Sequence, residues 1–307
     1  MARWALVLLV AGCTTPQERR DGCFSGFGHD TTFGDEVELL INGNPGSAME
    51  PRLTPDERFL FWNDKPASDD AMQLHVATRV DAGVYSYVGP LQGANVDGFL
   101  DGVPAIDASN RFFFVSLRTY GQNTRTIYSA RFDPSGPRLT DVTPIDEAIS
   151  EKKAGVVDMD IDVSNDGTAL LVSRAEFAPG STGPSKSRLE IFGVDAGVPF
   201  VSPSLAAWTS RINESTTCRQ YAAHLSSDGL ELFYTVLPLG SVEPADFRLA
   251  VSKRASVTEA FGPGAILDSI SGLLLEGPNL SIDGKRLTYH RFNQATGRWG
   301  IYQSKRP

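Results

Sequence analysis

Five segments of the sequence align without gaps, and one column of the alignment is polar in four of them. The segments read PRLTPDERFLFWN, PAIDASNRFFFVS, IDVSNDGTALLVS, AHLSSDGLELFYT and PNLSIDGKRLTYH, starting at positions 51, 104, 161, 223 and 278. If they are equivalent strands around an axis, their second residues converge on one mouth of an axial funnel. Ala105 occupies this column in the second copy, and the candidate binding residues are Arg52, Asp162, His224 and Asn279.

Three carboxylates stand close to this column, namely Asp107, Glu50 and Glu276. Paired carboxylates at a suitable separation are what glycosidic cleavage requires. The set resembles in outline the carboxylates of five-bladed glycoside hydrolases. No copy carries an acid that is out of register with its siblings, however, and polar residues also line water-filled channels. We therefore predict a binding role and no catalytic residue, with a carbohydrate-active hydrolase as the alternative.

Other chemistry has no signature in the sequence. The four histidines lack metal-ligand spacing, and Cys23 and Cys218 form no Cys-x-x-Cys pair. Gly-x-Ser-x-Gly, the phosphate-binding Gly-Lys-Ser/Thr loop and Gly-x-Gly-x-x-Gly are all missing from the sequence. We predict neither a metal site nor a cofactor.

The remaining columns predict turns between short strands. The third position is always aliphatic, and the fourth is Ser or Thr in four copies, whose hydroxyl can bond to the backbone of a turn. Asp-Gly then supplies the positive φ angles of a tight hairpin. The predicted turn residues are structural: Asp56, Asp166, Gly167, Asp228, Gly229, Asp283 and Gly284.

The strand after each turn is apolar at consecutive positions, as in FLFW from position 59 and FFFV from position 112. Continuous apolarity predicts that both faces of the sheet are buried, so each sheet needs a neighbour on either side. A third strand follows every copy and mostly ends on a basic residue. A fourth strand is marked by a Pro and a following aliphatic residue: Pro90–Leu91, Pro144–Ile145, Pro203 with Leu205, and Pro263 with Ile266. Ahead of the first copy, residues 37–42 supply this fourth strand.

One copy follows the next after 53 to 62 residues. Four strands in each such interval, joined by turns and without a sustained helical period, are typical of a propeller blade. We predict an all-β fold with little helix: a β-propeller of about five four-stranded blades over 35–307. A sixth blade, and the way in which the ring closes, stay open.

The Pro-x-Leu-Ser-x-Asp-Gly-x-x-Leu-x-Phe columns, followed by strands such as IYSAR, resemble the WD-repeat-like propeller repeats of TolB-type proteins. The resemblance covers about Asp35 to Arg306. It implies an envelope surface that grips a protein or glycan partner. TolB carries an additional α/β domain and six blades, so the likeness concerns the repeat and does not extend to the role of TolB in the Tol–Pal system.

The N-terminus resembles a bacterial lipoprotein signal. Arg3 precedes the apolar run WALVLLV, and small residues lead to Cys13. The run is too short to span a bilayer as a helix. We expect cleavage after residue 12, lipidation of Cys13 and attachment to the cell envelope, most simply the outer membrane since no Asp follows Cys13. An ordinary cleaved signal peptide is the alternative. Residues 13–34, rich in polar residues and without an apolar period, predict a flexible tether.

Once Cys13 is lipidated, Cys23 and Cys218 remain as an even pair. In an oxidising compartment they can form a disulfide between the tether and the propeller, although two unpaired thiols fit the sequence as well. The formal charge of −9, with no basic stripe, argues against nucleic acid or anionic lipid as a partner. We expect contact with the membrane through the lipid anchor alone, and an envelope protein or glycan as the partner.

Overall fold

The computed structural model describes residues 15–66, 71–178 and 183–307. The predicted signal peptide and the lipidation site Cys13 lie outside these residues. About half of the chain is strand and about a tenth is helix. Among the described residues, no helix combines the length and the apolar character needed to cross a bilayer.

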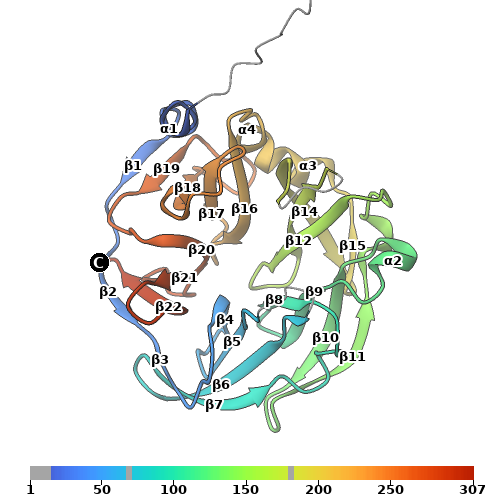
Figure 1. Cartoon of the computed structure of the whole chain (residues 1–307). Helices are drawn as coiled ribbons and strands as arrows, with labels where there is room; N and C mark the ends of the chain where they lie inside the picture. The colour runs from blue at the N-terminus through green and yellow to red at the C-terminus, as the bar shows by residue number, and fades with distance from the viewer. Residues whose placement is uncertain (1–14, 67–70, 179–182) are drawn as a thin grey trace, which may run out of the picture.

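Five sheets stand around a common axis, so the protein is a five-bladed β-propeller and not a six-bladed one (Figure 1). The blades are numbered here in chain order. Their inner strands contact one another in a closed ring, in which β4 meets both β8 and β20. The strands from the axis outward are β4 (Met49–Leu53), β5 (Phe59–Asn63), β6 (Leu74–Asp81) and β7 (Val84–Pro90) in blade 1; β8 (Asp101–Ile106), β9 (Arg111–Ser116), β10 (Ile127–Asp133) and β11 (Arg138–Pro144) in blade 2; β12 (Val156–Val163), β13 (Ala169–Glu176), β14 (Lys186–Asp195) and β15 (Val198–Phe200) in blade 3; β16 (Cys218–Leu225), β17 (Glu231–Pro238), β18 (Arg248–Lys253) and β19 (Gly264–Leu267) in blade 4; and β20 (Leu273–Leu280), β21 (Arg286–Asn293) and β22 (Arg298–Lys305) in blade 5.

The core lies between the blades, as the continuous apolar strands predict. Side chains of β5 alternate between two neighbours: Phe59 and Phe61 pack toward blade 2, whereas Leu60 and Trp62 pack with Ile301 of blade 5. Five buried clusters of this kind fill the five interfaces between adjacent blades. Each blade therefore depends on both neighbours for its stability.

The ring is closed by an N-terminal strand. β2 (Gly34–Glu38) pairs antiparallel with β22 and completes blade 5. The chain then passes to blade 1, where β3 (Leu40–Asn42) pairs parallel with β7.

The predicted single element over 37–42 is thus wrong, because the segment divides between two blades. The predicted strand at Pro203 is also wrong: the outer strand of blade 3 is β15, and Pro203 begins a short helix, α3 (Pro203–Ala206).

The flexible tether predicted before residue 35 is wrong for the residues that the structure describes. α1 (Pro16–Phe24) starts at Thr15, whose side chain forms a capping box with Glu18. β1 (Gly28–Asp30) then adds a parallel strand to the outer edge of blade 4. A disulfide joins Cys23 to Cys218 at the start of β16. The low hydropathy of this segment gives no sign of these elements in the sequence. They pack on the outside of the propeller, where β1 and β2 run along the rim (Figure 1).

The other helical elements with assigned bounds in the described residues are short and lie in loops between strands. They are α2 (Tyr120–Asn123), α4 (Ser210–Asn213), and the 3₁₀ turns η2 (Asp146–Ala148), η3 (Ala207–Thr209) and η4 (Pro244–Asp246).

The repeated turns that join the inner and second strands share one geometry. In blade 3 the Ser164 hydroxyl donates to Asp166 (2.6 Å), and the backbone N–H of Ala169 donates back to Ser164 Oγ (2.9 Å). Only the residue after the Asp has a positive φ, which is 71° at Gly167. Glu57 and Asn110 adopt the same conformation where Gly is missing, with φ of 56° and 63°. In blade 2 the order of the two residues is reversed: Asp107 comes first in the turn, and the hydroxyl of Ser109 donates to it (2.7 Å).

Candidate functional site

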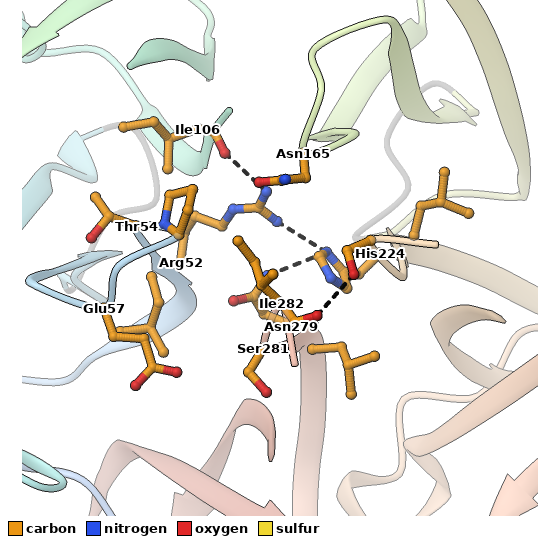
Figure 2. A pocket seen from close by; sticks show the side chains of 14 residues that line it. Arg52, Thr54, Glu57, Ile106, Asn165, His224, Asn279, Ser281 and Ile282 are labelled. Atoms are coloured by element: carbon orange, nitrogen blue, oxygen red, sulfur yellow. Dashed lines mark hydrogen bonds between the residues drawn. The ribbon is translucent and has the colours of Figure 1, made fainter. Parts of the chain in front are cut away.

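The four candidate residues of the polar column meet on the propeller axis. Arg52 reaches across from blade 1, and its Nη1 lies 2.5 Å from Asp162 Oδ1 of blade 3. His224 of blade 4 lies with its Nδ1 2.8 Å from Asp162 Oδ2 and 2.9 Å from Arg52 Nη1. Asn279 of blade 5 approaches the same ring nitrogen at 3.2 Å. Figure 2 shows Arg52, His224 and Asn279 pointing toward one another. We call these four residues the axial layer.

The axial layer is buried and blocks the axis. Arg52 and Asp162 are 7% and 4% exposed, and Arg52 also donates to the carbonyl oxygens of Ile106 (3.0 Å) and Val163 (3.3 Å). Burial raises the pKa of Asp162, but the charges of Arg52 and His224 outweigh it, so the pKa ends below its usual value. Ala105, the fifth member of the column, is fully buried beside them. The layer is therefore a cross-axis ion pair that separates two shallow hollows.

A second polar group lies in and beside the hollow on the side of the axis away from the repeated turns. Each inner strand is interrupted there by an irregularity in pairing, next to the residue that precedes the aligned segment. Those residues are Glu50, Val103, Asp160, Ala222 and Gly277, and all but Asp160 have a φ between 49° and 65°. A positive φ is strained for any residue but Gly, and such strain tends to gather at functional sites. At Gly277 a Cβ atom would come within 2.7 Å of the Glu50 carboxylate.

Two acids and a histidine meet at this place. One ligand atom each of Glu50, Glu276 and His290 lies within 4.8 Å of the other two. The backbone N–H of Glu50 donates to His290 Nδ1 (3.1 Å), so Nε2 carries the ring proton and donates to Glu276 Oε2 (3.2 Å). The Tyr221 hydroxyl donates to the other oxygen, Glu276 Oε1. Glu276 is thus held as a carboxylate by two donors.

The environment separates the proton affinities of the three acids. Burial raises the pKa of Glu50 well above its ordinary value, and the charges of Asp160 and Glu276 raise it further. Burial and the charge of Glu276 raise the pKa of Asp160 to about 7. Burial also acts on Glu276, but the hydrogen bonds from His290 and Tyr221 outweigh it, and its pKa ends below the usual value. Burial thus favours the protonated form of Glu50, whereas the two donors favour the ionised form of Glu276. We call Glu50, Asp160 and Glu276 the carboxylate site.

The side chains of Glu50, Glu276 and His290 are also of the types that bind a metal cation. Two carboxylates and an imidazole are suitable ligands for divalent metals. Both ring nitrogens of His290 are engaged, however, and Glu276 already accepts two hydrogen bonds. A metal at this place would have to break those bonds, so the geometry fits the holding of protons better than the ligation of a metal.

Sequence reasoning found part of this site. It identified the column that forms the axial layer and noted Glu50 and Glu276, but it missed Asp160, Tyr221 and His290. Asp107, which it placed with the acids, lies in the turn at the other end of its strand, where it holds Arg111 Nε (2.7 Å). The position just before each aligned segment could have pointed to this site, because it is occupied by Glu50 in the first copy and by Asp160 in the third.

Comparison with known proteins shows the fold. No protein-family model matches the chain, and no curated protein matches it in sequence. The catalytic domain of the Coprinopsis cinerea GH62 α-L-arabinofuranosidase superposes with a TM-score of 0.59 at 10% identity, covering 91% of this chain and 98% of that one. The native Bacillus subtilis arabinanase Arb43A superposes with a TM-score of 0.52 at 13% identity, covering 86% and 95%.

TolB from Acinetobacter baumannii superposes with a TM-score of 0.43 at 15% identity over 85% of this chain, which spans about half of the TolB chain (55%). At these identities the likeness to the arabinofuranosidase and the arabinanase shows the β-propeller fold alone.

Proposed function

We propose that the protein is an envelope glycoside hydrolase whose catalytic centre is the carboxylate site. The observation that carries the proposal is the close approach of Glu50 and Glu276 beside one axial hollow, with the pKa of Glu50 raised and that of Glu276 lowered. Two titratable groups whose surroundings push their pKa values apart are the usual basis of acid and base assignments. An arabinofuranosidase and an arabinanase share the propeller architecture, so this fold is compatible with glycoside hydrolysis. The assignment of the reaction itself rests on the residues of the carboxylate site.

The separation of the two acids assigns their roles. One carboxylate oxygen of Glu50 and one of Glu276 lie within 4.8 Å of each other, which fits the about 5–5.5 Å between the carboxyl groups of retaining glycosidases better than the about 6.5–9.5 Å of inverting ones. Glu50 donates its proton to the glycosidic oxygen while Glu276 attacks the anomeric carbon, which breaks the glycosidic bond and forms a glycosyl ester. Water then attacks the same carbon, gives a proton back to Glu50 and releases Glu276. The bonds from Tyr221 and His290 orient Glu276 for the first step.

The test is turnover by the purified full-length chain on arabinan, arabinoxylan and a panel of aryl glycosides. Glu276→Gln removes the nucleophile, and we expect kcat to fall by about a thousandfold or more. Glu214→Gln, at an exposed carboxylate, is the matched control and should behave as wild type. NMR of the first product should show a retained anomer. Turnover in Glu276→Gln at the wild-type rate, or no turnover on the panel, contradicts the proposal.

The closed axis favours a second candidate, a propeller that binds an envelope protein or glycan without cleaving it. The free space in the hollow at the carboxylate site is about 30 Å³, enough for one or two water molecules and too small for a sugar ring. Retention of the protein on immobilised polysaccharide without any turnover would support this candidate over hydrolysis.

The location of the protein is a separate proposal. We propose that residues 1–12 are removed as a signal peptide and that lipidated Cys13 anchors the chain to the bacterial outer membrane. The Cys23–Cys218 disulfide supports export, because such bonds persist in oxidising compartments. Metabolic labelling with an alkyne fatty acid should mark the wild type and not Cys13→Ser. Equal labelling of both would contradict the anchor.

A further inference from the structure

The carboxylate site cannot hold a substrate by itself. About 30 Å³ of free space admits water but no sugar ring. A glycan must therefore lie over the mouth of the hollow, and its binding energy must come from contacts elsewhere on the same face. Binding energy from remote parts of a substrate commonly supports reaction at the scissile bond.

A groove of about 560 Å³ at the seam between blades 5 and 1 has the size of a ligand site. Strand register places it at the same end of blade 5 as the carboxylate site. Glu276 pairs with His290 and His290 with Ile301, and two rows farther along β21 Phe292 pairs with Leu273 and with Trp299. Trp299 therefore lies two rows beyond Glu276 and His290 and two strands farther from the axis than Glu276.

A single stretch of chain connects the groove with the carboxylate site. The backbone N–H of Ala48 donates to the Trp299 carbonyl (3.0 Å), and two residues later that of Glu50 donates to His290 Nδ1 (3.1 Å). Residues 48–50 thus run from the wall of the groove to the proton donor of the proposed reaction.

The lining of the groove suits a carbohydrate. Trp299 is half-buried and held edge-on against Phe292, with ring centroids 4.9 Å apart, so its position is set before any ligand binds. Aromatic rings offer a large rigid apolar surface for the carbon face of a sugar. Around Trp299 stand side chains that can bond to hydroxyl groups: Glu38, Asn44, Thr296 and Arg298.

We infer that this groove is a second glycan-binding subsite, which holds the units of a polysaccharide next to the one placed over Glu50 and Glu276. The inference deepens the proposed hydrolase function and rests on it for the direction of the chain. It assigns an extended glycan as the substrate and makes Trp299 a specificity-determining residue.

The test measures binding of arabinan, arabinoxylan and their oligosaccharides by affinity gel electrophoresis and calorimetry. Wild type should bind longer oligosaccharides more tightly. Trp299→Ala should lose that dependence on length and weaken polysaccharide binding by about tenfold, because truncation of a central Trp commonly has an effect of this size. Arg298→Ala, at an exposed side chain that does not support the fold, should weaken binding in the same direction. Phe200→Ala, at an exposed ring on blade 3, is the matched control.

The outcomes separate this inference from the proposed reaction. If Trp299→Ala loses polysaccharide binding while wild type shows no turnover, the subsite stands and hydrolysis fails. If Glu276→Gln abolishes turnover while Trp299→Ala and Arg298→Ala bind every chain length as wild type does, hydrolysis stands and the subsite is wrong. Absence of binding to all the polysaccharides by wild type also overturns the subsite.

Discussion

Arg52 of blade 1 and Asp162 of blade 3 form an ion pair across the propeller axis, with Nη1 and Oδ1 2.5 Å apart and both side chains buried. The pair links two blades that are not neighbours, and it closes the axis near the C-terminal ends of the inner strands, where Arg52 and Asp162 are each the next-to-last strand residue. Its consequences for stability can be measured independently of any ligand.

Arg52→Ala leaves Asp162 buried without its cation. Removal of one partner of a buried ion pair commonly lowers the free energy of unfolding by about 3–5 kcal/mol. Arg58→Ala is the matched control: this Arg is exposed and lies 3.9 Å from Asp56, so its loss should change stability by less than about 1 kcal/mol. Urea denaturation of the two variants measures the difference. Equal midpoints would contradict the assigned role of the pair.

The ion pair also predicts sensitivity to acid. The folded-state pKa of Asp162 lies below its unfolded value, so its contribution to stability is present above about pH 4 and is lost as pH falls through the folded-state pKa. We expect Asp162→Asn to remove this part of the acid-dependent loss. Unfolding free energies measured between pH 3 and pH 7 check it, and an unchanged pH profile in Asp162→Asn would show that the contribution does not exist.

Asp160 predicts the opposite dependence on pH. Its folded-state pKa of about 7 lies above its unfolded value, so the folded protein binds the extra proton. The free energy of unfolding should fall as pH rises from about 4 to about 7. Asp160→Asn should be more stable than wild type at pH 8 by about 1 kcal/mol or more, and the advantage should shrink at pH 4. Asp195→Asn, at an exposed acid, should follow the wild-type profile.

The disulfide closes a loop of 195 residues that spans the ring seam. Cross-links over loops of this size stabilise by about 5 kcal/mol in the chain-entropy description. We expect dithiothreitol to lower the wild-type melting temperature and to leave Cys23→Ala/Cys218→Ala unaffected. Limited proteolysis should then cut first near α1. A melting temperature that does not respond to reduction would argue against a stabilising bond.

The turn of blade 4 tests the role of glycine in the repeat. Gly229 has a φ of 71°, where a Cβ atom costs about 1–2 kcal/mol. Gly229→Ala should lower the free energy of unfolding by this amount. Gly136→Ala, at a turn glycine without a positive φ and with open space around it, should have little effect. Chemical denaturation compares them, and equal stabilities would contradict the turn assignment.

Repetition in the sequence by itself determines the architecture. Five aligned copies with consecutive apolar residues require sheets buried on both faces, and the polar column gave the position of Arg52, Asp162, His224 and Asn279 along each blade. Local chemistry was sufficient because each turn and strand is specified within one repeat. The Ser164–Asp166 bond and its counterparts are of this kind.

Contacts between repeats were decided by the tertiary structure. Which column members pair across the axis depends on the number of blades, and the side chains that reach the axis depend on the irregularities in the inner strands. His290 pairs with Glu276 on the neighbouring strand of blade 5, and Glu50 joins them only because the ring closes between blades 5 and 1. The N-terminal residues 15–38 carry too little apolar pattern to show that they complete blades 4 and 5, since their stability comes from edges that the repeats leave open.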